Sequence, residues 1–376
     1  MRASLSATLA ALLCAACFVD PGVVGLSEGG TEATGTSTTT VADTTTTAGK
    51  MTTTTTTGAT STTSGSSGSS GSTGGGSTTT SGGPASCWDR SIDDWDDVVQ
   101  VTDAELGGDP RNPALSPDGL TLTYVALGMD ALPLRPYRAI RGGLDQPFGM
   151  ATLLAAWPDL KNLVGHPKIV GDEMVLMLPG FGSYDFARSL LVDGVWTDPA
   201  LMPGFDSADD EYYPSLTADG ARLIFVRGDG QAVPGVDLLS PWALYEASRP
   251  PNSPPGTEWG AIGEVALPFA ENPDYPHWRS CPVLSPDGLH LLLATTYPNV
   301  VDAGDPSASL EIAELRRDGL DAPWSTLNLA PSLHQEGRHG CPGGITADGC
   351  QMAYAELTLG GTGDDPYTIW LARRSP

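Results

Sequence analysis

One short motif recurs along this chain and constrains its fold: a proline, then Asp-Gly five or six residues later, then an alternating apolar run. Its first copy begins Asn112-Pro-Ala-Leu-Ser-Pro-Asp-Gly, and Leu120, Leu122 and Tyr124 alternate after Gly119. Pro, Asp and Gly in this order are typical of a type I turn closed by a glycine with positive φ. The motif therefore predicts a β-hairpin.

The hairpin motif is repeated along the C-terminal three quarters of the chain. Three later copies begin at Tyr213, Cys281 and Cys341, and a copy with a degenerate turn begins at His166. The repeat prolines stand at positions 113, 167, 214, 282 and 342, so successive copies are 47 to 68 residues apart. A repeat of this length, built from short strands and turns, is the signature of a β-propeller blade.

The motif resembles the Pro-x-x-Ser-Pro-Asp-Gly hairpin of the WD40-like or PD40 repeat family, which forms TolB-type propellers. The resemblance implies an all-β propeller fold for residues 87–376. TolB-type relatives interact with envelope proteins, so it also implies a protein or cell-wall partner. Propellers host many functions, and the resemblance does not name a ligand.

Five blades are expected, in a ring closed by the N-terminal strand. Each hairpin supplies the two inner strands of a blade, and a third and a fourth strand follow it. The chain ends after a third strand at Arg374, and the missing fourth strand is predicted at residues 95–102. A sixth blade would need an undetected repeat between Pro214 and Pro282, where four clustered prolines suit a loop better than strands.

Alternation along the second strand of each hairpin predicts the core. The side chains expected between blades are Leu122, Tyr124, Leu223, Phe225, Leu291, Leu293, Met352 and Tyr354. A second set of large side chains precedes or opens the fourth strands and is expected to pack under the blade edges. It comprises Trp95, Trp196, Trp259 and Trp324. A sugar-stacking platform is the alternative role for one of these tryptophans.

Residues 1–17 are predicted to be a lipoprotein-type signal peptide. The apolar run Leu5–Leu13 is too short to span a bilayer. It leads into Ala15-Ala16-Cys17, which resembles a bacterial lipobox and implies lipidation of Cys17. Membrane contact would then be through a lipid anchor alone, on the outer membrane or the cell surface. Ordinary cleavage, giving a secreted or periplasmic protein, is the alternative.

Residues 18–86 are expected to form a disordered stalk, because from residue 27 onward they are almost wholly Ser, Thr, Gly and Ala. Such a segment cannot bury enough apolar surface to offset its ordering entropy. Its flexible coil would span on the order of 45 Å. The sequence thus divides into a signal, a stalk and one globular part, residues 87–376.

The globular part is strongly acidic, with 17 basic residues against 41 acidic ones in residues 87–376. Nucleic-acid binding requires a basic face that displaces counterions, and no basic cluster is visible. Nucleic acid is therefore excluded as a partner, and self-repulsion favours a monomer.

Four cysteines remain once Cys14 and Cys17 are set aside with the signal: Cys87, Cys281, Cys341 and Cys350. An even number in an exported domain predicts two disulfides, with three possible pairings. The favoured pairing joins 341 to 350 and 87 to 281. Alternatively, 281 and 341 hold the same repeat position and bridge neighbouring blades.

Residues just before each repeat proline are expected to line one mouth of the central channel and to form the binding face. They are unusually rich in charged and aromatic side chains. The candidates are Asp109, Arg111, His166, Glu211, Tyr212, His277, Arg279, Glu336, Arg338 and His339. Polar loops that merely meet water are the alternative interpretation of this rim.

The sequence favours a binding module over an enzyme. Five-bladed glycosidases need two carboxylates held across the channel, and the acids here, such as Glu211, are expected in loops ahead of the inner strands. No nucleophile elbow or zinc-protease motif is present in the sequence. No cofactor is expected, although rim carboxylates could hold a structural Ca²⁺. The alternative function is a carbohydrate-active propeller, either hydrolytic or glycan-binding.

Overall fold

The computed structural model describes residues 86–101, 106, 110–127, 134–157, 165–179, 183–228, 243–268, 279–296, 310–333, 338–358 and 367–376. The predicted signal peptide, the lipidation site Cys17 and the stalk up to residue 85 lie outside these residues. Within them, no helix is long and apolar enough to cross a bilayer.

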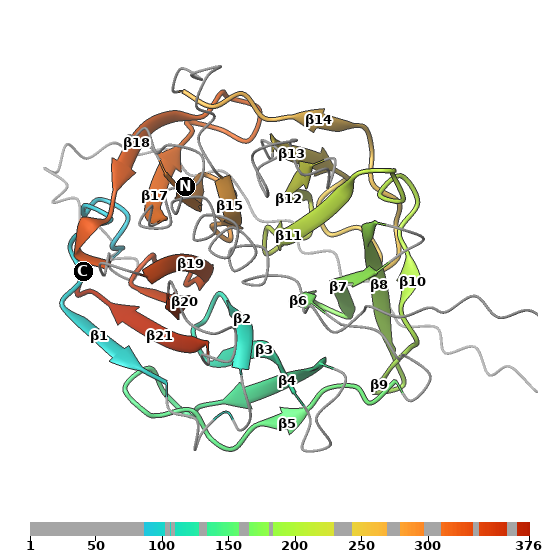
Figure 1. The fold of residues 1–376 in the computed structure, drawn as a ribbon, viewed down its shortest axis with the longest axis horizontal. Helices are drawn as coiled ribbons and strands as arrows, with labels where there is room; N and C mark the ends of the chain where they lie inside the picture. The colour runs from blue at the N-terminus through green and yellow to red at the C-terminus, as the bar shows by residue number, and fades with distance from the viewer. Residues whose placement is uncertain are drawn as a thin grey trace, which may run out of the picture. The chain divides into compact units, whose positions relative to one another are not determined.

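Five antiparallel sheets form a ring, as Figure 1 shows, so the predicted five-bladed propeller is confirmed. Blade 1 comprises β2 (Pro110–Leu115), β3 (Thr121–Leu127), β4 (Leu134–Ile140) and β5 (Thr152–Leu153). Blade 2 comprises β6 (Gly165–Val170), β7 (Glu173–Pro179), β8 (Tyr184–Val192), β9 (Val195–Trp196) and β10 (Ala200–Leu201). Blade 3 comprises β11 (Asp210–Leu216), β12 (Arg222–Gly228), β13 (Ala243–Ser248) and β14 (Ile262–Glu264).

Blade 4 comprises β15 (Arg279–Leu284), β16 (His290–Thr295), β17 (Glu311–Arg316) and β18 (Ser325–Leu329), followed by the short 3-10 helix η1 (Pro331–Leu333). Blade 5 comprises β19 (Arg338–Ile345), β20 (Gln351–Thr358), β21 (Thr368–Arg373) and the N-terminal strand β1 (Asp97–Gln100). β1 pairs antiparallel with β21, with Asp97 opposite Arg373. Ring closure by the N-terminal strand is therefore confirmed.

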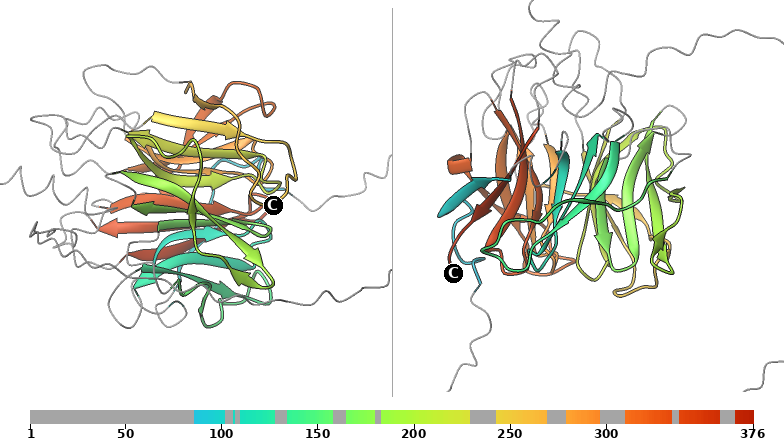
Figure 2. Two further views of the ribbon diagram at one scale, coloured as in Figure 1. Left: turned by 90° about the vertical axis from the view of Figure 1, so that its right-hand side faces the viewer. Right: turned by 90° about the horizontal axis from the view of Figure 1, so that it is seen from below.

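The first strand of each blade, beginning just before its repeat proline, lies nearest the axis of the ring (Figure 1). Seen from the side, the strands run along that axis (Figure 2). Each blade therefore presents two ends: one where the innermost strands begin, here the mouth end, and one where the Asp-Gly turns lie, here the turn end.

The repeated turns close in the same way in four blades. In blade 1 the carboxylate of Asp118 accepts hydrogen bonds from the Ser116 hydroxyl at 2.5 Å and the Leu120 amide at 3.0 Å. Asp219, Asp287 and Asp348 repeat this bracket. The Ser116 hydrogen bond, more than any other contact, holds the pKa of Asp118 below its usual value. The degenerate copy in blade 2 is instead a two-residue hairpin, with Val170 opposite Glu173.

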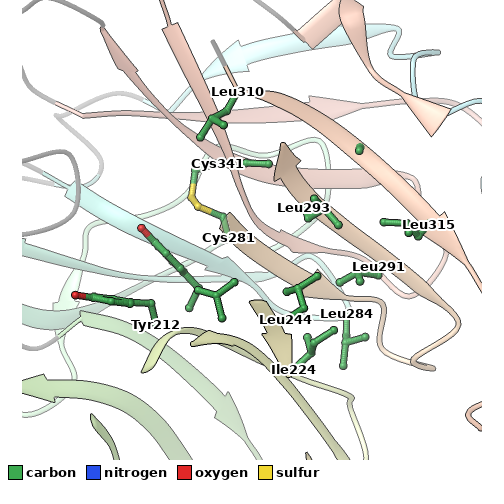
Figure 3. Packing of buried hydrophobic residues seen from close by; sticks show 14 of the residues in the cluster. Tyr212, Ile224, Leu244, Cys281, Leu284, Leu291, Leu293, Leu310, Leu315 and Cys341 are labelled. Atoms are coloured by element: carbon green, nitrogen blue, oxygen red, sulfur yellow. A yellow bond between two sulfur atoms is a disulfide. The ribbon is translucent and has the colours of Figure 1, made fainter. Parts of the chain in front are cut away.

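The core lies between the blades, and all eight side chains predicted from alternation are buried. Figure 3 shows one of the clusters, which joins Ile224 and Leu244 of blade 3 to Leu291 and Leu293 of blade 4. The closing strand is also fastened covalently: Cys87, which precedes it, forms a disulfide with Cys350 of blade 5. This pairing differs from the favoured one, because the segment before β1 passes beside the blade 5 turn.

Candidate functional site

In four of the five blades the residue before the repeat proline lies in a β-bulge on the innermost strand. Although not glycine, it has a positive φ of 50–58°: Asn112, His166, Tyr213 and Cys281. Such left-handed conformations cost roughly 1–3 kcal/mol each and persist only where the surroundings fix them. In blade 5 Cys341 is paired with Ala355, and the register shift follows Pro342. We call the five residues before the repeat prolines the axial layer.

A disulfide joins two members of this axial layer. Cys281 of β15 and Cys341 of β19 are bonded, and both are buried (Figure 3). The favoured pairing of Cys341 with Cys350 is therefore wrong, whereas the alternative, in which equivalent repeat positions bridge neighbouring blades, is confirmed. Equivalent positions meet because the innermost strands of blades 4 and 5, β15 and β19, lie in contact, while Cys341 and Cys350 lie at opposite ends of one hairpin.

The other members of the axial layer are polar. The His166 ring meets the Tyr213 ring edge-on, with centroids 4.3 Å apart. Two residues further along β6, the Lys168 Nζ donates a hydrogen bond to the Gly343 carbonyl of blade 5. Burial, and then the charge of Lys168, hold the pKa of His166 well below its usual value, and burial lowers the pKa of Lys168 to about 7.

The predicted rim residues fall into two groups in the structure. Asp109, His277 and Glu336 lie outside the described residues, as do the side chains of Arg338 and His339, whose backbone opens β19. Of the rest, the four residues His166, Glu211, Tyr212 and Arg279 are buried, and only Arg111 keeps partial exposure. The Arg111 guanidinium lies 4.7 Å from the centre of the Tyr367 ring, joining blade 1 to blade 5.

Glu211 lies inside a strand, which differs from the expectation that it precedes one. It is the second residue of β11, pairs with Arg227 of β12, and has no exposed surface. Its Oε1 accepts a hydrogen bond from the Ser207 hydroxyl at 2.6 Å and an ion-pair hydrogen bond from Arg227 Nε at 2.8 Å. The strand begins earlier than the motif indicates because the bulge lets pairing resume before the repeat proline.

The second oxygen of Glu211 has no hydrogen-bond partner among the described residues. Burial raises the pKa of Glu211 to about 7, and the charge of Asp185 on β8 acts in the same direction. Burial also raises the pKa of Asp185. The negative charge of Asp185 therefore disfavours ionisation of Glu211 at the interface of blades 2 and 3.

Further hydrogen bonds tie this pair to the mouth end. The Asp210 carboxylate accepts hydrogen bonds from the Tyr184 amide at 2.7 Å and from the Tyr212 hydroxyl at 3.2 Å. The Ser183 hydroxyl reaches both the Asp185 carboxylate and the Ser207 carbonyl. One polar network thus holds the start of β8 against the start of β11.

An arginine that the sequence analysis missed follows the third strand in four blades. In blade 3 Arg249 donates from Nε to the carbonyl of the turn Gly220 at 2.8 Å, lies 4.3 Å from the centre of the Trp259 ring, and forms an ion pair with Glu173 of blade 2. The same arrangement, with Nε on the carbonyl of the turn glycine and the guanidinium over the aromatic residue that precedes the fourth strand, occurs at Arg141, Arg317 and Arg374. The available signal was an arginine directly after the third strand of four blades, together with an aromatic residue ahead of the fourth strand.

Comparisons with known proteins give no family. No known protein-family profile matches the chain, and no curated protein matches it. Solved structures with similar geometry include a TolB candidate from Agrobacterium tumefaciens, at 14% identity and a TM-score of 0.41, covering 70% of this chain and 76% of that one. A glycosyl hydrolase from Bacteroides ovatus has 13% identity and a TM-score of 0.41, covering 70% of this chain and 84% of that one. A GH62 hydrolase bound to xylotriose has 9% identity and a TM-score of 0.43, covering 73% of this chain and 94% of that one. Similarities this low assign no function.

Proposed function

We propose that this chain is a non-enzymatic binding module of the cell envelope, anchored through Cys17 and recognising a protein or cell-wall partner with its mouth end. The two disulfides support an oxidising compartment outside the cytosol. The anchor and the stalk are proposed from the resemblance of residues 1–17 to a lipobox and from the composition of residues 18–86.

One observation carries the choice of face. At the turn end the blades repeat the same closed contacts, Asp brackets and arginine stacks, which serve the fold. At the mouth end equivalent positions differ from blade to blade: three residues before the repeat proline stands Pro110 in blade 1, Glu211 in blade 3 and Arg279 in blade 4. A fold needs repeated contacts, whereas a specific partner is recognised by an arrangement that does not repeat.

The experiment is capture from envelope extract by the full chain, with one double variant at each end of the propeller. Arg111→Ala combined with Asp209→Ala alters partly exposed groups at the mouth end. Asp318→Ala combined with Asp172→Ala alters exposed groups at the turn end. We expect a partner held by the parent and the turn-end variant to be lost from the mouth-end variant. Equal capture by all three proteins would refute the proposed face.

A carbohydrate-active propeller is the second candidate, because Asp185 and Glu211 form a carboxyl pair with a raised Glu211 pKa of about 7. A glycosidase acid shares this property. Glu211 has no exposed surface, however, and a general acid must reach the glycosidic oxygen of its substrate. Hydrolysis of plant or bacterial glycans by the parent, abolished in Glu211→Gln, would establish this alternative over the binding module.

A further inference from the structure

The first residue after each repeat proline forms a second layer around the axis, and one member of it differs from the rest. Four of the five residues have short side chains: Ala114, Ser215, Val283 and Gly343. The fifth is Lys168, whose side chain reaches from blade 2 to the Gly343 carbonyl of blade 5. Blade 1 lies between these two blades, so Lys168 bridges strands that are not neighbours in the ring.

Blade 5 contributes only backbone at this level because there is no room for a side chain. A Cβ on Gly343 would lie 2.3 Å from the Pro113 carbonyl oxygen, and one on Gly344 would lie 2.4 Å from the Leu115 amide nitrogen. Contacts under 3.0 Å do not occur for real Cβ atoms. The lysine amine therefore faces carbonyl groups and small side chains.

When Lys168 is protonated, no acid among the described residues neutralises its charge. Within the described residues it is the only lysine, it forms no ion pair, and one of its three N–H donors has an acceptor, the Gly343 carbonyl. A buried ammonium group without a counter-charge is strongly disfavoured.

His166, two residues earlier on β6, also lacks hydrogen-bond partners for its polar side-chain atoms among the described residues. It is 6% exposed, packs edge-on against Tyr213, and neither ring nitrogen makes a hydrogen bond within the described part of the chain. The charge of Lys168 acts on it directly. The side chains that the other inner strands bring to these two layers, Asn112 among them, include no acid.

We propose that the axis of the propeller binds a small oxyanion, a carboxylate or a phosphate, between Lys168 and His166. The ammonium group has two N–H donors to offer and the imidazole one or two, and each is a charge-assisted donor when protonated. The partial exposure of Lys168 lets a small ion reach the site from solvent. This chain has a net charge of −26, which repels anions in general, so anion binding must come from a built site.

Occupancy is linked to protonation. Without an anion, burial favours the neutral forms of both basic groups, and an anion between them favours the charged forms. The anion should therefore bind more tightly at pH 6 than at pH 8. On their own strand, the charge of Lys168 lowers the pKa of His166, whereas the pKa of Lys168 is lowered by burial. On the adjacent strand β11, Tyr213 packs against the His166 ring, and Glu211 is paired with Arg227.

The first test is thermal unfolding of the full chain in phosphate or acetate against chloride at equal ionic strength. About 50 mM phosphate should raise the parent Tm by at least about 3 °C, and more at pH 6 than at pH 8. Lys168→Met should abolish the rise, and Lys168→Arg should keep it. Arg138→Met, which removes an exposed cation of β4, is the matched control and should respond like the parent.

Two peptide arms separate the sources of the oxyanion. Stabilisation by phosphate and acetate but not by triglycine would identify a free small ion. Additional stabilisation by triglycine, absent with its C-terminal amide, would identify the carboxylate of a chain end. Both outcomes support the site.

A second measurement on the parent chain does not depend on a variant that folds. Reductive methylation labels the three lysines, and mass spectrometry follows Lys50, Lys161 and Lys168 separately. Phosphate should slow labelling of Lys168 at least about tenfold and leave the other two unchanged. The proposal is overturned if phosphate does not protect Lys168, or if Lys168→Met folds and keeps the full anion effect.

Discussion

Replacing Glu211 by glutamine should change how the stability of the propeller depends on pH. The substitution keeps the size of the side chain and the hydrogen bond from Ser207, and it removes the titrating carboxyl group that faces Asp185. The prediction concerns the difference between parent and variant, because other buried groups also titrate.

The magnitude follows from the pKa of Glu211, which burial raises from 4.5 to about 7. This corresponds to about 3 kcal/mol of unfolding free energy. The folded state holds the proton more tightly than the unfolded state. The contribution is therefore fully present below pH 4.5 and is lost as the pH rises through 7. His166 acts in the opposite direction, since its lowered pKa costs stability as the pH falls below 6.5.

Urea unfolding of the oxidised full chain, followed by tryptophan fluorescence between pH 4.5 and 8, measures this difference. The parent should lose about 2–3 kcal/mol relative to Glu211→Gln across that range, with the steepest change between about pH 5 and 6.5, where the folded state holds the proton and the unfolded state does not. Glu258→Gln, at an exposed position, is the control and should run parallel to the parent. Parallel curves for the parent and Glu211→Gln, within about 0.5 kcal/mol, would show that folding does not raise the pKa of Glu211.

Three further predictions concern the ring. Replacing Cys281 and Cys341 together by alanine should lower the unfolding free energy by about 4 kcal/mol, and a loss under about 1 kcal/mol by calorimetry would mean that the axial bond adds little. Arg249→Met should lower the unfolding free energy measured in urea by about 3–5 kcal/mol, because the Glu173 carboxylate stays buried and unpaired. An unchanged unfolding midpoint would show that the repeated arginine does not stabilise the ring. Gly344→Ala should lower the Tm strongly, because the added Cβ would clash with the backbone of Leu115. Gly263→Ala, with nothing within 4 Å of its Cβ, should leave the Tm nearly unchanged. Equal effects of the two substitutions would contradict the close contact of blades 5 and 1.

The blades could be predicted because each one repeats a local signal. The turn Pro117-Asp118-Gly119 sets a hairpin without help from the rest of the chain, and alternation after it determines which residues, such as Tyr124, are buried. The closing strand was predictable because the fifth hairpin is followed by a third strand but no fourth, while a strand-like segment precedes the first hairpin.

The disulfide pairing and the burial of the predicted rim residues could not be predicted, because both depend on β-bulges in the innermost strands. A bulge shifts the register by one residue and changes which side chains reach the axis, as it does for Cys281 and for Glu211. The proposed binding residues Arg111, Glu211 and Arg279 remain a prediction. Glu211 and Arg279 are buried, so we expect exposed residues near them at the mouth end to contact the partner.

The affinity of a captured partner for the mouth-end and turn-end variants tests the central claim most directly. With the partner identified and titrated calorimetrically, Arg111→Ala with Asp209→Ala should weaken binding at least about tenfold, or about 1.4 kcal/mol. Asp318→Ala with Asp172→Ala, at the turn end, should leave the Kd within about twofold of the parent. The reverse pattern would place recognition at the turn end, and equal affinities for both variants would contradict a binding face at the mouth.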